Sequence, residues 1–437
     1  MGNPLPWQKR RLGTCIVLRS GGTPSKSRPE YWNGSIPWVS CKDMKVNRID
    51  DAQDHVTALG ASEGSRIVGP GSILIVVRGM ILAKEFPVAI VKREVTFNQD
   101  LKAVECNECV RPDFMYYWLT SNAYEIKGIA DEAAHGTKRI QTDRLLNLTI
   151  HVPELGVQRR IASILSAYDD LIENNSRRIA ILEEMAQAIY REWFVHFRFP
   201  GHEQARFVDS PLGRIPEGWK LNDLGYFVNK GVVNLQTGPF GTQLKASDYT
   251  DSGTPLINVR NIGYGAVRRD SIEHVPEEIV VRLAAHILHE GDIVFGRKGA
   301  VDRHALISRN EDSWMQGSDC LRLRSLSPEV SPYLLSHAFR EKRHQEWMFN
   351  QCSHGATMPS LNQDVICRIP CLIPTPLLRD SFSEMASLIA RRVAILRMHS
   401  EKLKQSRDLL LPKLISGQLD VEALDIETGE LALEAEA

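Results

Sequence analysis

The chain has 437 residues, of which 43% are hydrophobic and 24% charged, and its formal net charge is −1. These values are typical of a globular protein of two or three domains and exclude a fibrous or wholly disordered chain. No apolar run reaches the roughly 18 residues that span a bilayer, the start lacks the apolar core of a secretory signal, and the eight cysteines are expected to be reduced thiols in the cytoplasm.

Residues 1–155 have the pattern of a mixed α/β domain. Short β-branched segments lie between clusters of Gly, Pro, Asn and Asp, which is typical of strands joined by turns. These segments are 37–41, 72–77, 86–91 and 148–153, and a helix is expected over 114–130.

Residues 156–198 are expected to form one long helix, because 157–194 contain neither Pro nor Gly. Apolar residues recur there at steps of three and four, which places them on one narrow stripe, as in a coiled coil. The stripe contains Val157, Ile161, Ile164, Tyr168 and Leu171, and after a one-residue slip Ile172, Ile179, Leu182, Ala186, Ile189 and Trp193. Asn175 occupies a position in this seam, where a polar residue tends to fix the register.

A linker rich in Pro and Gly (199–218) precedes a second domain (219–376), which includes an expected helix over 332–349. A second long helix is expected over 377–417, and Pro412 should kink or end it. Its stripe contains Ile389, Val393, Leu396, Leu403 and Leu410.

The last segment, 418–437, carries seven acidic residues and no basic one, and we expect it to be disordered. Without those seven, 47 acidic residues remain against 53 basic ones, so the rest of the chain is mildly basic. A phosphate-binding surface is therefore permitted, although the composition does not require one.

The sequence repeats itself after 212 to 221 residues, which indicates a duplicated unit. Six pairs of segments match in the same order: 7–13 with 219–225, 36–44 with 254–262, 71–79 with 291–299, 99–101 with 318–320, 135–137 with 354–357, and 177–182 with 391–396. Each unit is a domain followed by a long helix. If the two helices bury their stripes against each other, they form an antiparallel pair, and the units are related by a pseudo-two-fold axis. The expected fold class is α+β: two mixed α/β domains joined by an antiparallel coiled coil.

Residues that suggest catalysis are sparse. Asp113, Glu125 and Lys127 match a loose nuclease pattern, but Glu125 and Lys127 lie in an expected helix, and the second unit has no counterpart. Cys106 and Cys109 are half of a zinc site without a second half nearby. His135 and His354 each begin a His-Gly turn, for which a role in the turn is favoured over a contact with a base. We therefore expect no catalytic residue, metal or cofactor in this chain.

Basic residues on loops and strands are the candidate DNA-binding set. Glycine beside Arg or Lys lets the backbone approach a phosphate that the side chain neutralises. For any single residue a solvated surface charge is the simpler reading, but Arg78-Gly79 and Lys298-Gly299 recur in equivalent places. The candidates are Lys42, Lys45, Arg78, Lys84, Lys138 and Arg139 in the first unit, and Arg260, Arg268, Arg297, Lys298 and Arg303 in the second.

Up to about Leu419 the chain resembles the DNA-specificity subunit of type I restriction-modification systems. The resemblance rests on the alternation of two domains with two helices, on the helix start from Val152-Pro153 to Gln158, and on the ending 409–417 (LLLPKLISG). Val157 replaces the usual Glu of the first helix start, and Arg379-Asp380 replace the Glu-Gln pair of the second.

The resemblance implies a non-catalytic reader of double-stranded DNA whose two target-recognition domains each read half of an asymmetric bipartite site. It implies that the spacer helices set the gap and dock two modification (methyltransferase) subunits, and that ATP-dependent restriction subunits join the complex. S-adenosylmethionine, ATP and Mg would be bound by those partners. A scaffold that holds two interaction domains apart without binding DNA, and an enzyme with an unfamiliar site, are the alternatives.

Overall fold

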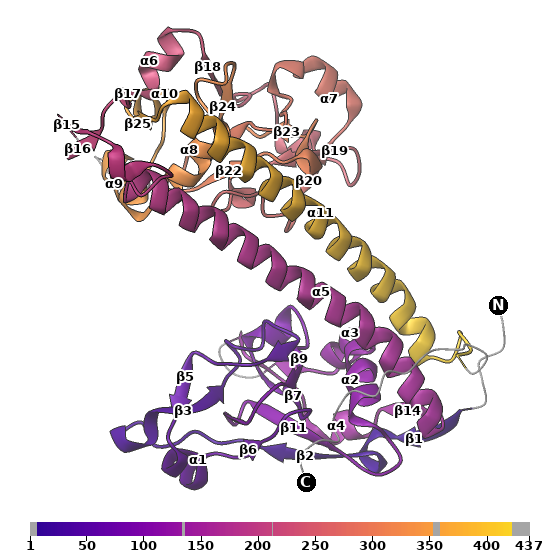
Figure 1. Cartoon of the computed structure of the whole chain (residues 1–437). Coiled ribbons are helices and arrows are strands. Elements are labelled where there is room, and N and C mark those ends of the chain that lie inside the picture. Colours follow the sequence, from indigo (N-terminus) through magenta and orange to yellow (C-terminus); the bar gives the residue numbers. More distant parts are fainter. Residues whose placement is uncertain (1–6, 133–135, 212, 353–358, 422–437) are drawn as a thin grey trace. The chain divides into compact units, whose positions relative to one another are not determined.

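The computed structural model describes residues 7–132, 136–211, 213–352 and 359–421 (Figure 1). Contacts divide the chain into two units, Met1–Ile172 with Lys402–Ala437, and Glu173–Glu401. Both boundaries fall inside long helices, so each unit contains a globular domain together with a part of each helix.

The globular part of the first unit is built on short sheets. A five-stranded sheet has the order β2-β11-β7-β9-β4, and a four-stranded sheet has the order β5-β3-β10-β6. Small sheets β12-β13-β8 and β1-β14 complete the set. The strands are β1 Gln8–Arg11, β2 Ile16–Ser20, β3 Trp32–Val39, β4 Arg48–Ile49, β5 Asp54–Val56, β6 Ile67–Val68, β7 Ile73–Val76, β8 Arg78–Gly79, β9 Val88–Val91, β10 Val95–Phe97, β11 Leu101–Cys106, β12 Asp131–Glu132, β13 Lys138–Arg139 and β14 Thr149–Val152.

Strand β7 is the centre of the first core. All four of its residues are buried, which is why it is a continuous apolar run rather than an alternating one. Helix α2 (Pro112–Ser121) and helix α3 (Ala123–Gly128) occupy the segment expected to be one helix, and they are separated at Asn122. Two short helices, α1 (Ala58–Gly64) and α4 (Thr142–Leu146), lie in connections between strands.

Helix α5 (Leu155–Tyr190) begins against this core and continues as a π-helical turn, Arg191–Val195. Gln158 is fully buried at its start and accepts a hydrogen bond from the Arg111 N–H at 2.8 Å. Its amide donates to the carbonyls of Cys109 and Pro153, at 3.0 and 2.8 Å. Gln158 therefore joins α5 to the loop before α2.

The second unit has its own sheets, with the orders β18-β24-β21-β22, β20-β19-β23, β17-β25 and β15-β16. Their strands are β15 Phe207–Ser210, β16 Gly213–Pro216, β17 Lys220–Asp223, β18 Val233–Thr237, β19 Thr254–Ile257, β20 Glu273–Val275, β21 Ile293–Gly296, β22 His304–Leu306, β23 Met315–Gln316, β24 Cys320–Ser325 and β25 Pro370–Ile373. The helices are α6 Leu224–Asn229, α7 Glu277–Arg282, α8 Pro332–Phe339, α9 Lys342–Cys352, α10 Gln363–Cys367 and α11 Pro376–Ile415. The helix expected over 332–349 is thus α8 followed by α9.

Part of the strand pairing recurs in the two units, although their sheets differ in the number of strands. In the first unit, strand β11 pairs antiparallel with β2 and with β7. In the second unit, strand β24 pairs antiparallel with β18 and with β21. In both, a strand that carries an internal Pro, β3 or β19, has one parallel neighbour and one antiparallel neighbour. The first and last strands of each domain also pair, β1 with β14 and β17 with β25.

The apolar stripes of the two long helices are largely protected from solvent. Five residues of the stripes are buried: Val157, Ile161, Ala186, Val393 and Leu396. Eleven others are partly buried: Ile164, Tyr168, Ile172, Asn175, Ile179, Leu182, Ile189, Trp193, Ile389, Leu403 and Leu410. Leu171 differs from the expectation, since its side chain is 51% exposed. The one-residue slip that follows Leu171 in the sequence turns it away from the stripe that Ile172 continues.

Helix α11 continues for three residues beyond Pro412, to Ile415, so the proline does not end it at once. Proline removes a single backbone donor, and near a C-terminus the remaining turn is closed by the Ser416 N–H, which donates to the Pro412 carbonyl at 3.0 Å. Gly417 then has a φ of +72° and ends the helix. The expected turns at His135 and His354, and the acidic segment from residue 422 on, lie outside the described residues.

Candidate nucleic-acid interface

Arg78 and Lys298, the two cations that precede a glycine, lie at the same place in the two sheets, just after the buried strands β7 and β21. In the first unit, Val77 N–H donates to the Asp100 carbonyl at 2.9 Å and Val77 accepts from the Ile140 N–H at 2.9 Å. In the second, Arg297 N–H donates to the Asp319 carbonyl at 2.8 Å, and Arg297 accepts from Leu361 N–H at 2.8 Å. Arg78 follows Val77 and Lys298 follows Arg297, so the recurrence in the sequence corresponds to a shared backbone arrangement.

The glycines at these sites have a conformational reason. Gly79 and Gly299 have φ values of +151° and +76°, which residues with a side chain rarely adopt. These glycines turn the chain immediately after the cation. The segment after α3 pairs with this turn in the first unit, and the segment after α9 does so in the second. Lys138 pairs with Gly79 in the first unit, and Lys298 bridges to Ser360 in the second.

Three candidates of the first unit are brought together by this pairing. Arg139 lies opposite Arg78, and Lys138 opposite Gly79, in the sheet β12-β13-β8. Arg78 and Arg139 are exposed, and Lys138 is partly so. Among the described residues none of the three has a carboxylate within 4.0 Å, so their positive charges are not neutralised locally.

The turn after β3 lies beside this cationic strand pair. The Cys41 thiol donates to the Arg78 carbonyl at 3.4 Å, and exposed Lys42 is the next residue. Lys45 and Lys84 are also exposed, on the turn after β3 and after the short 3-10 helix Met80–Ala83. No direct contact joins these two lysines to Arg78 in the described part of the chain.

Several candidates of the second unit are already paired with acids. Arg260 lies 2.6 Å from Glu273, Lys298 lies 3.2 Å from Asp319, and Arg268 lies 3.9 Å from Asp270. Half or more of each basic side chain is exposed, so these ion pairs are weak and can be displaced by a phosphate.

Arg297 and Arg303 have aromatic partners instead of acidic ones. The Arg297 guanidinium carbon lies 5.2 Å from the centre of the Phe240 ring, and that of Arg303 lies 5.1 Å from the Tyr264 ring. Both rings are more than half exposed, Phe240 at 57% and Tyr264 at 51%. These aromatic residues were not among the sequence candidates, because they lie far from the two arginines along the chain.

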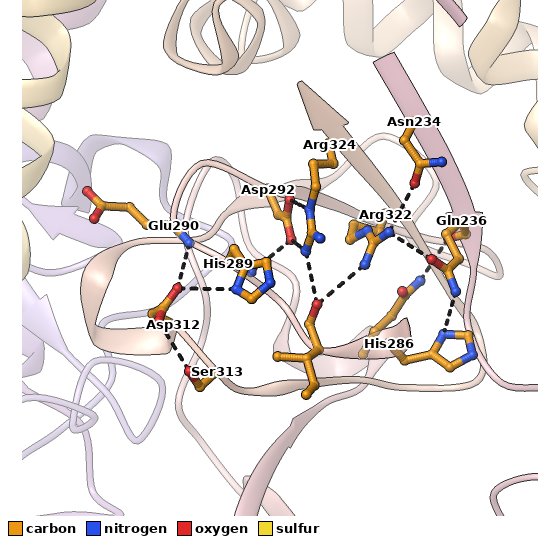
Figure 2. A network of polar contacts seen from close by, with 12 residues as sticks. Asn234, Gln236, His286, His289, Glu290, Asp292, Asp312, Ser313, Arg322 and Arg324 are labelled. Atoms are coloured by element: carbon orange, nitrogen blue, oxygen red, sulfur yellow. Dashed lines mark hydrogen bonds and ion pairs between the residues drawn. The ribbon is translucent and has the colours of Figure 1, made fainter. Parts of the chain in front are cut away.

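A polar network on strands β18 and β24 and on the loop before β21 holds two further arginines inside the second unit (Figure 2). Arg324 forms two hydrogen bonds with the buried Asp292 carboxylate, at 2.7 and 2.6 Å. Arg322, 3% exposed, donates to Asn234 at 3.0 Å and to Gln236 at 2.7 Å. Both guanidiniums also donate to the Ile287 carbonyl.

The acids and histidines of this network are committed to structural contacts. Asp312 accepts from the Glu290 N–H at 2.9 Å, and burial lowers the pKa of His286, whose ring meets the Gln236 amide at 3.5 Å. The sheet thereby satisfies charges that would otherwise be costly to bury.

The residues that resembled a nuclease pattern make contacts with different partners. Asp113 pairs with Arg111 at 2.8 Å, whereas Lys127 donates to the Lys84 carbonyl at 3.3 Å from α3. All eight cysteines are free thiols, and burial raises the pKa of Cys106 to about 12. Within the described ranges, no group of three or more His, Cys, Asp and Glu side chains is arranged to hold a metal. No described helix combines the length and apolar character needed to cross a bilayer.

Comparison with known proteins places this geometry in context. The family described as "Type I restriction modification DNA specificity domain" matches residues 4–184. The MjaIX type I restriction enzyme specificity subunit of Methanocaldococcus jannaschii is 25% identical over 96% of this chain and 95% of its own length. The EcoR124I/EcoR124II specificity subunit of Escherichia coli is 35% identical, over 44% of this chain and 49% of its own length.

The chain is related to the specificity subunits of type I restriction enzymes. A crystal structure of such an S subunit from M. genitalium shares the fold, with a TM-score of 0.61 and 16% identity over 95% of this chain and 97% of that one. The resemblance seen in the sequence is therefore confirmed. The matching family is one of DNA-specificity domains and not of catalytic ones, in agreement with the expectation that this chain is not an enzyme.

Proposed function

We propose that this specificity-subunit relative recognises an asymmetric bipartite site in double-stranded DNA, and that each unit reads one half. The main support is the recurrence of a cation at the turn after the buried central strand of both domains, Arg78 and Lys298. Equivalent backbone arrangements with different neighbouring side chains are what two readers of different half-sites require. We propose that all eleven candidate cations take part in DNA binding, and that those around Arg78 and Arg297 form the central part of the binding surface of each unit.

We propose further that α5 and α11 form an antiparallel coiled coil that relates the units by a pseudo-two-fold axis and sets the gap. Contacts within each unit support this pairing. In the first, Arg407 lies 2.6 Å from Asp169. In the second, Arg397 lies 2.7 Å from Glu183. As the residue number rises on α5 it falls on α11, which is the order of an antiparallel pair.

The domain of the second unit also contacts α11, which a fixed separation of the half-sites requires. Arg269 donates to Glu401 on α11 at 2.8 Å, its guanidinium lies over the Trp314 ring at 5.2 Å, and it pairs with the buried Glu311 carboxylate at 2.5 Å. Asn310 donates to the Ala394 carbonyl of α11 at 2.7 Å. We infer that a domain held in this way cannot turn freely, so the length of the helices fixes the separation of the half-sites.

The expected partners are two methyltransferase subunits and ATP-dependent restriction subunits, and the long helices are their proposed platform. Support comes from apolar side chains on these helices that stay exposed: Ile181 at 56% and Met185 at 50% on α5, and Leu388 at 59% on α11. S-adenosylmethionine, ATP and Mg would belong to those partners. The segments 1–155, 156–198, 199–218, 219–376, 377–417 and 418–437 remain the proposed division into recognition domains, spacer helices, linker and tail.

A selection from random DNA duplexes tests this function. The full-length chain, purified with its modification subunits, should enrich two short motifs separated by a constant number of unread base pairs, and binding should weaken steeply with salt. Replacement of residues 219–376 by the corresponding domain of a relative should change one motif and leave the other. A scaffold that does not bind DNA would give no enrichment and no salt-dependent binding.

A further inference from the structure

The loop after strand β21, residues 297–303, carries two arginines that differ from the other candidate cations of the second unit. Neither Arg297 nor Arg303 has a carboxylate within 4.0 Å in the described part of the chain, whereas Arg260 and Lys298 do. Each guanidinium lies over an exposed aromatic ring. The two side chains therefore keep their full charge on a surface that is already partly desolvated.

Their hydrogen-bonding capacity is also unused. The Nε atoms of Arg297 and Arg303 are buried and lack a partner among the described residues. The Nε atom of Arg322 is buried without a partner as well, but the Nη atoms of that side chain make four hydrogen bonds. Arg322 is thus a structural residue. For Arg297 and Arg303 no side-chain hydrogen bond within the described chain competes with a ligand.

The aromatic rings under these arginines are fixed by contacts of their own. The Tyr264 hydroxyl donates to Asp302 at 2.9 Å, and Tyr264 bridges to His304 in the backbone, so the ring is tied to the loop that carries Arg303. The Phe240 N–H donates to the Gln243 amide oxygen at 3.2 Å, which closes the turn that carries the second ring.

The backbone at Gly238, where the Phe240 turn begins, is closely packed. The Gly238 N–H donates to the Cys320 carbonyl at 2.9 Å, and a Cβ atom at Gly238 would lie 2.0 Å from the Gly317 carbonyl oxygen. The turn is consequently packed against the start of β24. The Tyr264 ring is thus tied through its hydroxyl, the Phe240 ring is carried by a packed turn, and each ring lies against one guanidinium.

A planar guanidinium that rests against an aromatic ring is suited to the recognition of a base edge. Guanine presents the N7 and O6 acceptors in the major groove, and arginine meets them with two parallel N–H groups. A phosphate is bound by the arginine fork as well, but a lysine also binds it as a point charge, so a phosphate contact survives the change to lysine in part. Resting on the DNA-binding function proposed above, we propose that Arg297 and Arg303 each read one guanine of the half-site bound by the second unit.

The substitution of Arg by Lys separates these two roles. Arg297→Lys and Arg303→Lys keep the positive charge and lose the planar fork. The full-length variants, purified with the modification subunits, are passed through the random-duplex selection and compared with the wild type. Each variant is expected to lose the preference for G·C at one position, by about 5- to 150-fold. The rest of the motif and the salt dependence should stay the same.

One further variant is a matched control, and two others test the ring that lies against Arg297. Arg309→Lys, at an exposed arginine of the second unit that is not among the candidate cations, should leave the motif unchanged. Phe240→Leu should weaken the preference at the position that Arg297 reads, and Phe240→Tyr should restore it, because only the aromatic face orients the guanidinium.

Each outcome decides the proposal. If the wild type enriches a bipartite motif and both Arg→Lys variants enrich the same motif, the two arginines do not read bases and the inference is wrong. If Arg297→Ala and Arg303→Ala weaken binding to all sequences equally, they are phosphate contacts, which also overturns it. If the wild type enriches no motif at all, the proposed DNA-reading function fails, and the inference that rests on it fails too.

Discussion

Arg407 on α11 lies with its Nη1 atom 2.6 Å from the Asp169 carboxylate on α5, and the Tyr117 hydroxyl of α2 donates to the same carboxylate at 2.8 Å. The side chains of Arg407 and Asp169 are only 18% and 10% exposed. Burial and then the Asp169 charge raise the pKa of Tyr117, so its hydroxyl stays protonated as a donor. One carboxylate thus joins both long helices to the globular domain of the first unit.

The loss of Arg407 should destabilise the protein strongly. Arg407→Met leaves the Asp169 charge buried with only the tyrosine hydroxyl, and the removal of one partner of a buried pair costs about 3–5 kcal/mol. We expect a loss of about 3 kcal/mol in a urea titration. Arg177→Met, at an exposed pair with Glu173, should cost less than about 1 kcal/mol. Equal losses for the two variants would contradict this account.

The buried amide of Gln158 should be indispensable for the junction of α5 with the first domain. Gln158→Leu removes the partners of the Arg111 N–H and of the carbonyls of Cys109 and Pro153. A buried group without a partner costs about 1–3 kcal/mol, so we expect at least 2 kcal/mol in chemical denaturation. Gln141→Leu, at an exposed amide that donates to Asp131, is the control and should change the stability by about 0.5 kcal/mol.

The second unit should lose stability in mild acid. Burial, with a smaller effect of Arg340, lowers the pKa of His337 to about 3, and burial lowers that of His304 well below its usual 6.5. Since the unfolded chain takes up these protons near pH 6.5 and the folded chain does not, the stability contributed above pH 6.5 is lost as the pH falls toward the folded values.

Measurements of unfolding free energy between pH 7 and 4 test this sign. Each of the two histidines should contribute a decrease of about 1.4 kcal/mol per pH unit below its unfolded pKa. His337 Nδ1 lies 2.7 Å from the Gln187 amide oxygen, and His337→Asn keeps a donor there without a titrating ring. This variant should show a shallower pH dependence than the wild type. A dependence of the same slope would mean that His337 does not titrate as described.

The exposed apolar residues of the helices should matter for assembly and not for folding. Met185→Lys places a charge at a half-exposed apolar site on α5, and we expect co-purification of the modification subunit to fall at least about tenfold, which corresponds to roughly 1.4 kcal/mol. Glu184→Lys introduces the same side chain at the adjacent exposed polar position and should bind the partner normally. Normal assembly of Met185→Lys would move the docking surface elsewhere.

The sequence contained most of the architecture but only part of the site. Short β-branched segments between clusters of Gly, Pro, Asn and Asp predicted the mixed α/β domains, and the apolar stripe from Val157, in a segment without Pro or Gly, predicted α5. The recurrence of Arg78-Gly79 and Lys298-Gly299 led to equivalent turns because the glycines must adopt positive φ there. The exposure of Leu171 was missed because a slip in the stripe does not specify which of two adjacent residues turns outward.

The partners of the cations could not be predicted, because they depend on tertiary folding. Glu273 neutralises Arg260 from the neighbouring strand β20, and Phe240 lies under Arg297 from a turn far away along the chain. Spacing along the chain specifies neither contact. The distinction between paired and unpaired arginines, on which the proposed base reading rests, therefore required the folded structure.

The length of the gap between half-sites tests the central claim most directly. One heptad is inserted into α5 after Ser176 and one into α11 after Lys402, between the ion pairs Asp169–Arg407 and Glu183–Arg397. Seven helical residues add about 10 Å, which is roughly three base pairs of DNA. Selection with this variant should yield the two wild-type motifs with a gap about three base pairs longer, whereas an unchanged gap with both motifs retained would contradict the proposal that these helices separate two DNA-reading units.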